Sequence, residues 1–283
     1  MPDGPGRLAV VSDLDGCLLD ADTYALTPAR STLRRLRRAD IPLALCTSKT
    51  RAEVVALWRR FGGRHVAVLE DGGGILVPPR VLRAPLPGAR RTADGRLLPL
   101  GPPYARVRAA LRDLGAADRP MVRGFGDMSP EEIQRETGLD AASARRAARR
   151  EFDEPLRLHG GPRIFAAVRR AAARHGLILT RGGRFVHLHG RFDKGLATRR
   201  LRRLLEREHG PLHLIALGDS PLDAPMLRAA DVAIIIPHPD GRADPTLRRL
   251  VPRAREAPAA GPSGWALAVN ALLDAAGRPP LQV

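Results

Sequence analysis

The chain has 283 residues, of which 44% are hydrophobic, and this is enough for one large core or two moderate cores. Its 47 Lys and Arg residues outnumber 30 Asp and Glu residues, for a formal net charge of +17, whereas aromatic residues make up only 4%. The charge alone would suit a nucleic-acid-binding protein. However, the basic residues are spread over predicted helices, and no aromatic stacking platform or zinc-binding pattern accompanies them, so we expect no nucleic-acid partner.

Further partners and locations are limited by what the chain lacks. No apolar run of about 18 residues occurs, and Met1–Arg7 has no charged-then-apolar signal pattern. We therefore expect no membrane association and a cytoplasmic location. Cys17 and Cys46 are too few for a disulfide scaffold and are expected to be small buried residues. Monomer and homodimer both remain open.

The first predicted element is a buried strand, Leu8–Ser12, that ends in two carboxylates. Asp13 and Asp15 follow it, and Gly16 comes next, where a tight turn would need positive φ. Ligands of open α/β sheets bind outside the carboxyl ends of the strands. Two carboxylates there repel each other unless a cation lies between them, and hard oxygen ligands suit Mg²⁺.

The next elements are a helix and a second strand. Thr27 is the predicted N-cap of a helix over 29–39, and 41–46 is the strand. Thr47, Ser48 and Lys49 follow the strand and precede a helix, and hydroxyls and free N–H groups at such a turn can bind phosphate. The alternative for Thr47 is a plain N-cap of the helix that follows.

The chain changes character near Arg83, where prolines become frequent. We predict that 84–188 is an inserted α+β unit, with helices over 104–114, from 130, over 141–150 and over 163–175, and a hairpin about Gly182-Gly183. The flanking segments 1–83 and 189–283 then form one α/β core.

Lysine usage singles out two positions in the core. Of the 47 basic residues only Lys49 and Lys194 are lysine, so a compact ammonium stands at two places where this chain would otherwise use arginine. Lys194 opens a long helix, and the strand 212–217 after that helix leads into Asp219. Ser220 and Asp223 follow as supporting polar groups. A cation beside carboxylates would lower the pKa of a nucleophile and offset phosphoryl charge.

Four pieces in this order, namely Asp13-Leu14-Asp15-Gly16, Thr47, Lys194 and Gly218–Asp223, resemble the motifs of the haloacid dehalogenase superfamily. The resemblance implies a Rossmann-like parallel-sheet core with an inserted α+β cap that sets substrate specificity. It also implies that Asp13 is the nucleophile, Asp15 the general acid/base and Lys194 a third catalytic residue, with Mg²⁺ held by Asp13, Asp15 and Asp219. Leu222 departs from the usual pattern, which has Asn there.

Further segments resemble the mannosyl-3-phosphoglycerate phosphatase family: 124–128, 137–139, 150–155, 182–185 and 262–265. This implies hydrolysis of mannosyl-3-phosphoglycerate, or a close glycosyl-3-phosphoglycerate, through an aspartyl-phosphate, on the way to mannosylglycerate, a compatible solute. In the cap, glycine-rich backbone could bind the substrate carboxylate and acidic groups its hydroxyls. The candidate substrate residues there are Gly126, Asp127, Met128, Glu151 and Arg163.

Two alternatives stay open at this point. One keeps the fold and changes the reaction, making the protein a general sugar-phosphate phosphatase or a phosphohexomutase. The other is a nucleic-acid-binding protein on an inactive phosphatase core.

Overall fold

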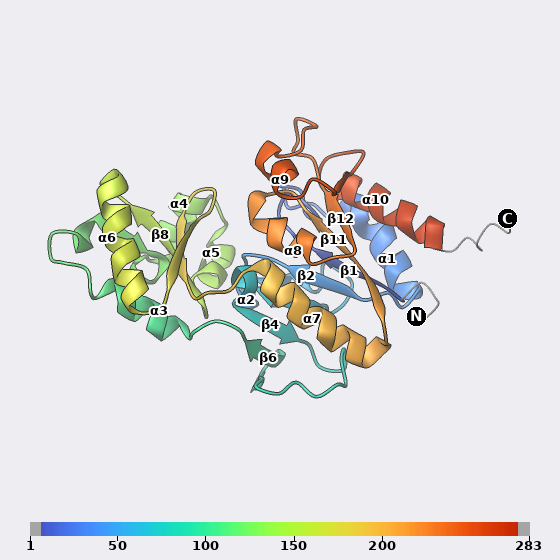
Figure 1. Cartoon of the computed structure of the whole chain (residues 1–283), viewed down its shortest axis with the longest axis horizontal. Helices are drawn as coiled ribbons and strands as arrows, with labels where there is room; N and C mark the ends of the chain where they lie inside the picture. Colours follow the sequence, from blue (N-terminus) through green and yellow to red (C-terminus); the bar gives the residue numbers. More distant parts are fainter. Residues whose placement is uncertain (1–6, 277–283) are drawn as a thin grey trace.

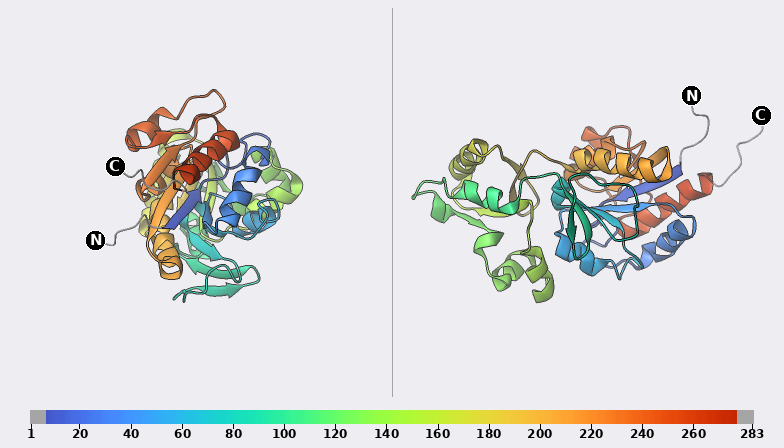
Figure 2. Two further views of the ribbon diagram at one scale, coloured as in Figure 1. Left: turned by 90° about the vertical axis from the view of Figure 1, so that its right-hand side faces the viewer. Right: turned by 90° about the horizontal axis from the view of Figure 1, so that it is seen from below.

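The computed structural model describes residues 7–276, and these form two α/β units joined by two connections, residues 100–103 and 190–193 (Figure 1). The larger unit holds a nine-stranded sheet and the smaller a four-stranded sheet. The right-hand view of Figure 2, seen from below, also shows that the units lie next to each other along the long axis of the molecule. The larger unit is the predicted core, whose outermost segments 1–6 and 277–283 lie outside the described residues.

The core sheet has the strand order β13-β12-β11-β1-β2-β3-β4-β6-β5. The six strands from β13 to β3 run parallel, whereas β4, β6 and β5 are antiparallel to their neighbours. The strand bounds are β1 Arg7–Ser12, β2 Leu43–Cys46, β3 Val66–Leu69, β4 Gly74–Val77, β5 Arg90–Thr92, β6 Gly95–Pro99, β11 Leu212–Gly218, β12 Val232–Ile235 and β13 Arg255–Glu256.

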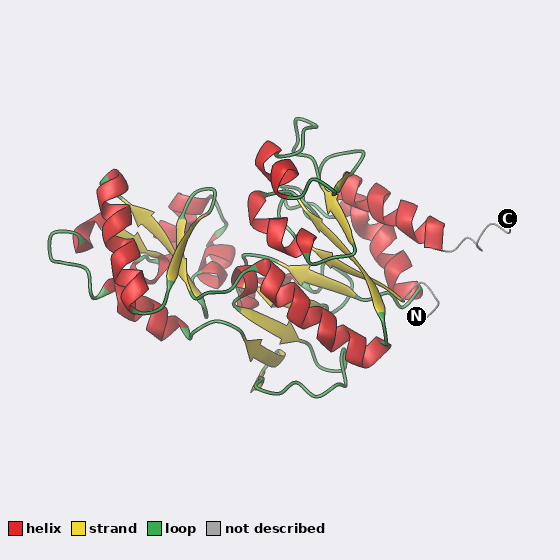
Figure 3. Ribbon diagram, viewed as in Figure 1, coloured by secondary structure: helices red, strands yellow, loops and turns green. Residues whose placement is uncertain are grey.

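Helices cover both faces of this sheet (Figure 3). Successive strand residues point to opposite sides, so each strand presents side chains to the helices on both faces. Val10 packs on one face and Ala9 and Val11 on the other. The first face is covered by α1 Arg30–Arg38, α2 Arg51–Leu57 and α10 Gly261–Ala276, and the second by α7 Lys194–His209, α8 Ala224–Arg228 and α9 Pro245–Leu250. The parallel strands from β12 to β3 are therefore covered on both sides, as their continuous apolar sequences predict, whereas β13 at the edge of the sheet is charged and exposed.

The smaller unit has the strand order β7-β8-β10-β9, all antiparallel. Two helices pack on one face of this sheet, and a second pair, packed against each other, lies on the opposite side beside β7 and β8, where Arg123 and Arg157 pair with Glu132 and Glu136. The bounds are α3 Tyr104–Leu111, β7 Val122–Gly124, α4 Pro130–Thr137, α5 Ala141–Ala147, β8 Asp153–Leu158, α6 Gly161–Arg174, β9 Ile178–Arg181 and β10 Val186–His189. An α+β unit inserted between two parts of the core is the predicted arrangement of a cap.

Two sequence predictions need correction. The inserted unit does not begin at residue 84, because 90–99 forms β5 and β6, which extend the core sheet by pairing with β4. Thr27 is not the N-cap of a regular helix, because 27–29 forms a 3-10 turn before α1 and no side chain caps it. In contrast, Ser129 and Glu132 form the predicted capping box of α4.

None of the helices found between residues 7 and 276 has both the length and the apolar character needed to cross a bilayer.

Candidate active site

Three neighbouring parallel strands end at the same edge of the core sheet. Ser12 of β1 lies level with Leu217 of β11 and Leu45 of β2, so the residues that follow these strands emerge together. Those residues include Asp13 after β1, Thr47 after β2 and Asp219 after β11. This edge is where ligands bind in open α/β sheets, and the predicted motif residues meet there although they are up to about two hundred positions apart in the sequence.

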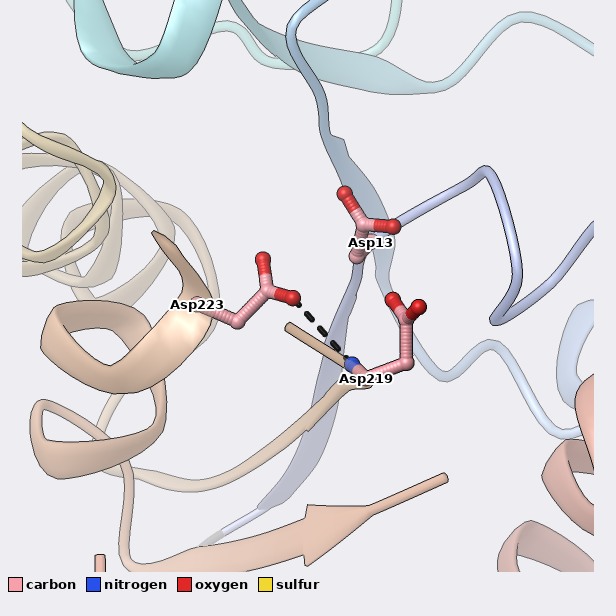
Figure 4. Close-up of side chains that lie close together, drawn as sticks. All are labelled: Asp13, Asp219 and Asp223. Carbon is pink, nitrogen blue, oxygen red and sulfur yellow. Dashed lines mark hydrogen bonds between the residues drawn. The ribbon is translucent and has the colours of Figure 1, made fainter. Parts of the chain in front are cut away.

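Three carboxylates gather at this edge. Asp13, Asp219 and Asp223 each offer an oxygen within 4.8 Å of the others (Figure 4). One oxygen of Asp223, Oδ2, accepts hydrogen bonds from the backbone N–H groups of Asp219 and Ser220 and from the Ser220 hydroxyl. Asp223 and Ser220 thus hold the loop that presents Asp219, which is the supporting role predicted for them.

Lys194 lies at the centre of the cluster. Its side chain is 4% exposed, and Nζ donates hydrogen bonds of 2.6 Å to both Asp13 Oδ1 and Asp223 Oδ1. Nζ also lies 3.6 Å from Asp71 Oδ1. Asp193 caps the helix α7 on which Lys194 stands by accepting from the Leu196 N–H, so the helix start fixes the direction of the lysine stem.

Burial and mutual repulsion strongly perturb these carboxylates. Burial raises the pKa of Asp13 well above its ordinary range; Lys194 lowers it, and the neighbouring carboxylates raise it further. Burial, together with Asp223, raises the pKa of Asp219 to about 7. Burial alone would lower the pKa of Lys194, but Asp13 and Asp223 outweigh it, so that pKa rises and the ammonium persists at neutral pH. The cluster therefore holds more negative charge than one lysine can balance.

The donor set fits a hard divalent cation such as Mg²⁺, which prefers carboxylate and carbonyl oxygens. Asp15 Oδ1 is buried and has no hydrogen-bond partner among the described residues. Gly16 has φ +79°, and a Cβ there would lie 2.6 Å from Asp219 Oδ2. Glycine is thus required for the Asp15 turn to approach Asp219 so closely.

The predicted phosphate-binding turn lies beside this cluster. Thr50, rather than Thr47, forms the N-cap of α2 in a capping box with Glu53. The alternative of a plain N-cap for Thr47 is therefore wrong, and its buried hydroxyl accepts only the Lys49 N–H among the described contacts. Lys49 Nζ lies 2.8 Å from Asp15 Oδ2 and 5.0 Å from the Tyr24 ring centroid, so this ammonium pairs with the second carboxylate of the first motif.

A buried tryptophan supports the end of β1. Trp265, in the predicted motif 262–265, is fully buried on α10, and its indole Nε1 donates a 2.9 Å hydrogen bond to Ser12 Oγ. Ser12 directly precedes Asp13. The closing helix thus fixes the strand end that presents the first carboxylate.

One buried carboxylate of the core, Glu70, binds the backbone of the cap. Glu70 accepts 2.9 Å hydrogen bonds from the backbone N–H groups of Glu151, Phe152 and Asp153. Burial raises the pKa of Glu70 to about 7, although Arg150 opposes the shift. The Phe152 ring packs into the core, and a Cβ at Gly73 would lie 2.4 Å from its Cβ. The segment 150–153 therefore docks rigidly beside the site.

The five cap residues predicted to bind substrate each have contacts within the protein. Asp127 pairs with Arg108 and Arg119, and Arg163 pairs with Asp118 on an exposed part of α6. Glu151 pairs with Arg51 of α2 and Arg90 of β5, and so ties the cap to the core. The Gly126 N–H donates to Glu154 and Met128 packs on a small apolar cluster of the cap.

A different set of cap residues lies near Lys194. A cavity of about 280 Å³ reaches from Lys194 and Asp71 to the face of the cap sheet opposite α3 and α6, where it is lined by Asp153, Ile178, Thr180, His187 and His189. None of the five predicted cap residues lines it. The sequence signal that could have found this set is the alternation His187-Leu188-His189, because two histidines on one side of a strand with an apolar residue between them indicate a polar sheet face.

Comparisons with known proteins agree with this geometry. No family model matches the chain. A glucosyl-3-phosphoglycerate/mannosyl-3-phosphoglycerate phosphatase from Methanococcoides burtonii is 36% identical over 269 residues, covering 95% of this chain and 97% of the relative. An identically named protein from Persephonella marina is 34% identical over 235 residues, covering 82% of this chain and 85% of the relative.

A solved structure shows the same fold. A Bacteroides thetaiotaomicron phosphatase of the haloalkanoate (HAD) enzyme superfamily matches with a TM-score of 0.65 at 15% identity, over 97% of each chain. The similarity to the two relatives over most of the chain, together with the meeting of the four motifs at one sheet edge, leads to one conclusion: the chain belongs to the glucosyl-3-phosphoglycerate/mannosyl-3-phosphoglycerate phosphatase family.

Proposed function

We propose that the protein is a Mg²⁺-dependent phosphatase that hydrolyses mannosyl-3-phosphoglycerate, or the closely related glucosyl ester, to the glycosylglycerate and phosphate. The observation that carries this proposal is the buried group of Asp13, Asp219 and Lys194 at the carboxyl edge of the sheet. The substrate class comes from the names of the two relatives, which this chain matches over most of its length.

In the proposed reaction Asp13 attacks phosphorus and forms an aspartyl-phosphate, which divides one difficult step into two easier ones. Asp15 protonates the leaving alkoxide and later removes a proton from the water that hydrolyses the intermediate. Lys194 holds Asp13 in the attacking position through its 2.6 Å hydrogen bond. Thr47 and the turn through Ser48 and Lys49 bind the phosphate oxygens that face away from Asp13.

Bound Mg²⁺ would supply charge neutralisation for the transferring phosphoryl group. Asp13 and Asp219 would hold it, together with the backbone carbonyl of Asp15. The high pKa of Asp219 is consistent with this assignment, because a carboxylate that is costly to ionise without a cation becomes favourable to ionise beside one.

The test is phosphate release by the purified protein from mannosyl- and glucosyl-3-phosphoglycerate, with and without Mg²⁺, by wild type and Asp13→Asn. We expect release that needs Mg²⁺ and disappears in the variant. Return of a phosphosugar with little free phosphate would indicate a mutase, and equal rates on unrelated sugar phosphates would indicate a general phosphatase. Salt-sensitive DNA binding without hydrolysis would contradict both the activity and the proposal of a small-molecule partner.

A further inference from the structure

The cavity between Lys194 and the face of the cap sheet opposite α3 and α6 contains buried polar atoms that have no hydrogen-bond partner among the described residues. Asp153 is 2% exposed and His189 6% exposed, and both line the cavity. Asp153 Oδ1, His189 Nδ1 and Asp71 Oδ1 are buried and have no hydrogen-bond partner among residues 7–276, although Asp71 Oδ1 lies 3.6 Å from Lys194 Nζ. Burying a polar atom without a hydrogen bond is unfavourable unless something else binds it, so the grouping of these atoms around one cavity indicates a ligand.

The surrounding contacts hold these atoms in place. Asp153 Oδ2 accepts from Arg150 Nη2 at 2.6 Å and from His187 Nδ1 at 2.8 Å, so only Oδ1 remains for a ligand. His189 Nε2 hydrogen-bonds Thr180 Oγ1 at 2.7 Å, which leaves Nδ1. These hydrogen bonds fix the rings of His187 and His189 and the carboxylate of Asp153 before a ligand binds. A specific recognition site needs such preorganisation.

Charge decides what kind of group can enter. The Arg150 and His187 partners hold the pKa of Asp153 at about 2, although burial opposes them, so the carboxylate is ionised. Burial lowers the pKa of His189, so that ring is neutral at pH 7. The one lysine at the cavity, Lys194, is already shared by Asp13 and Asp223. The cations Arg150, His187 and Lys194 already pair with carboxylates of the protein, so none of them is left for a carboxylate or phosphate of a ligand, whereas hydroxyl groups can donate to the carboxylates and bond the imidazole.

The remaining lining is apolar. Ile178, Phe192, Leu222 and Pro225 complete the wall. Leu222 is the residue that stands where the superfamily motif usually has Asn, and here it supplies apolar surface beside Lys194. Apolar surface with a few fixed polar groups is the ordinary lining of a small-molecule pocket, and a sugar ring presents both C–H faces and hydroxyls.

We propose that this cavity is the glycosyl subsite, with Asp153, His189 and Asp71 binding hydroxyl groups of the sugar, and that the substrate carboxylate binds elsewhere. The inference rests on the proposed function, since it assigns one part of that substrate to one part of the site. It places sugar selection on the face of the cap sheet opposite α3 and α6, in residues different from Gly126, Asp127, Met128, Glu151 and Arg163.

The experiment compares kcat/KM for mannosyl- and glucosyl-3-phosphoglycerate with kcat/KM for acetyl phosphate, which carries no sugar. Two full-length variants test the subsite: His189→Phe keeps a ring and removes both nitrogens, and Ile178→Trp fills the cavity without removing a polar group. His175→Phe is the matched control, because this cap histidine pairs with Asp113 outside the cavity.

We expect both subsite variants to lower kcat/KM for the glycosyl substrates at least about tenfold, the scale of a lost hydrogen bond to a charged or buried group, and to leave acetyl phosphate and the control unchanged. Equal losses on all substrates, or no loss on any, would overturn the glycosyl subsite. If His189→Phe fails to fold, Ile178→Trp decides by the same criteria. Failure of the proposed function can be told apart from failure of the glycosyl subsite, because the wild-type protein would then cleave acetyl phosphate and neither glycosyl ester.

Discussion

Replacing Lys194 by Met tests whether this lysine holds the catalytic carboxylates together. Methionine keeps the length and apolar stem of the side chain and removes its charge. Asp13 and Asp223, both within 2.6 Å of Nζ, would then face each other without a cation in a buried site. Breaking a buried ion pair by removing one partner costs about 3–5 kcal/mol. For a protein of this size that corresponds to a loss of roughly 6–20 °C in Tm.

The pH at which this is measured follows from the direction of the lysine shift. The folded pKa of Lys194 lies above its ordinary value of 10.5, so its contribution is fully present below pH 10.5 and is lost only as the pH rises through the higher folded value. Urea unfolding at pH 7.5 in EDTA, followed by far-ultraviolet circular dichroism, therefore measures the whole effect. Toward pH 5 the loss should shrink, because the carboxylates of the variant can take up protons instead.

A double-mutant cycle separates the ion pair from general packing. Lys194→Met combined with Asp223→Asn should cost less than the sum of the single variants by about 0.5–3 kcal/mol, because the second change removes one of the stranded charges. Lys194→Arg should lose phosphatase activity at least about tenfold, or 1.4 kcal/mol in barrier, since the wide guanidinium does not fit where the ammonium lies. An additive cycle, or a Lys194→Met protein as stable as wild type, would refute the assigned role.

Three further predictions follow from the same geometry. Because the pKa of Asp219 is about 7 without metal, the metal-free protein should lose stability as the pH rises from about 4 through 7. The rise in Tm on adding Mg²⁺ should be largest above pH 7 and fade toward pH 5, and a rise independent of pH would contradict metal binding at Asp219. Gly16→Ala should abolish stabilisation by Mg²⁺ and phosphatase activity while the core stays folded, since the alanine Cβ would lie 2.6 Å from the Asp219 carboxylate. Circular dichroism measures the folding and phosphate release the activity, and wild-type activity would show that the turn can relax. Glu70→Gln should lower the free energy of unfolding by about 1–3 kcal/mol, because an amide cannot accept hydrogen bonds from all three cap N–H groups. Limited proteolysis of this variant should cut near residues 150–153, and an unchanged cleavage pattern would mean that Phe152 alone holds the cap.

Local sequence patterns determined much of the fold and the chemical core of the site. Apolar runs of four to seven residues marked the parallel strands other than β13, and the carboxylates after them marked the edge where the motif residues meet, because parallel strands that share a sheet place their carboxyl ends together. The scarcity of lysine singled out Lys194 and Lys49, and both ammonium groups contact carboxylates of the first motif. These features could be predicted because each depends on residues close in sequence or on one topological rule.

Tertiary pairing decided the rest. The strands β5 and β6 carry arginine, proline and glycine and gave no apolar run, and they belong to the core only because β4 offers them an edge. Glu151 and Asp127, which are expected from the sequence to bind substrate, form ion pairs with Arg51 and Arg108, and no local pattern identifies these arginines as their partners. The closeness of His189 and Asp153 could not be predicted, since they are 36 positions apart and meet only through the register of β10 on β8. The ion-pair partners of a carboxylate come from segments distant in the sequence. The hydrophobic periodicity of a segment carries no information about which charged side chain of another segment will lie nearest.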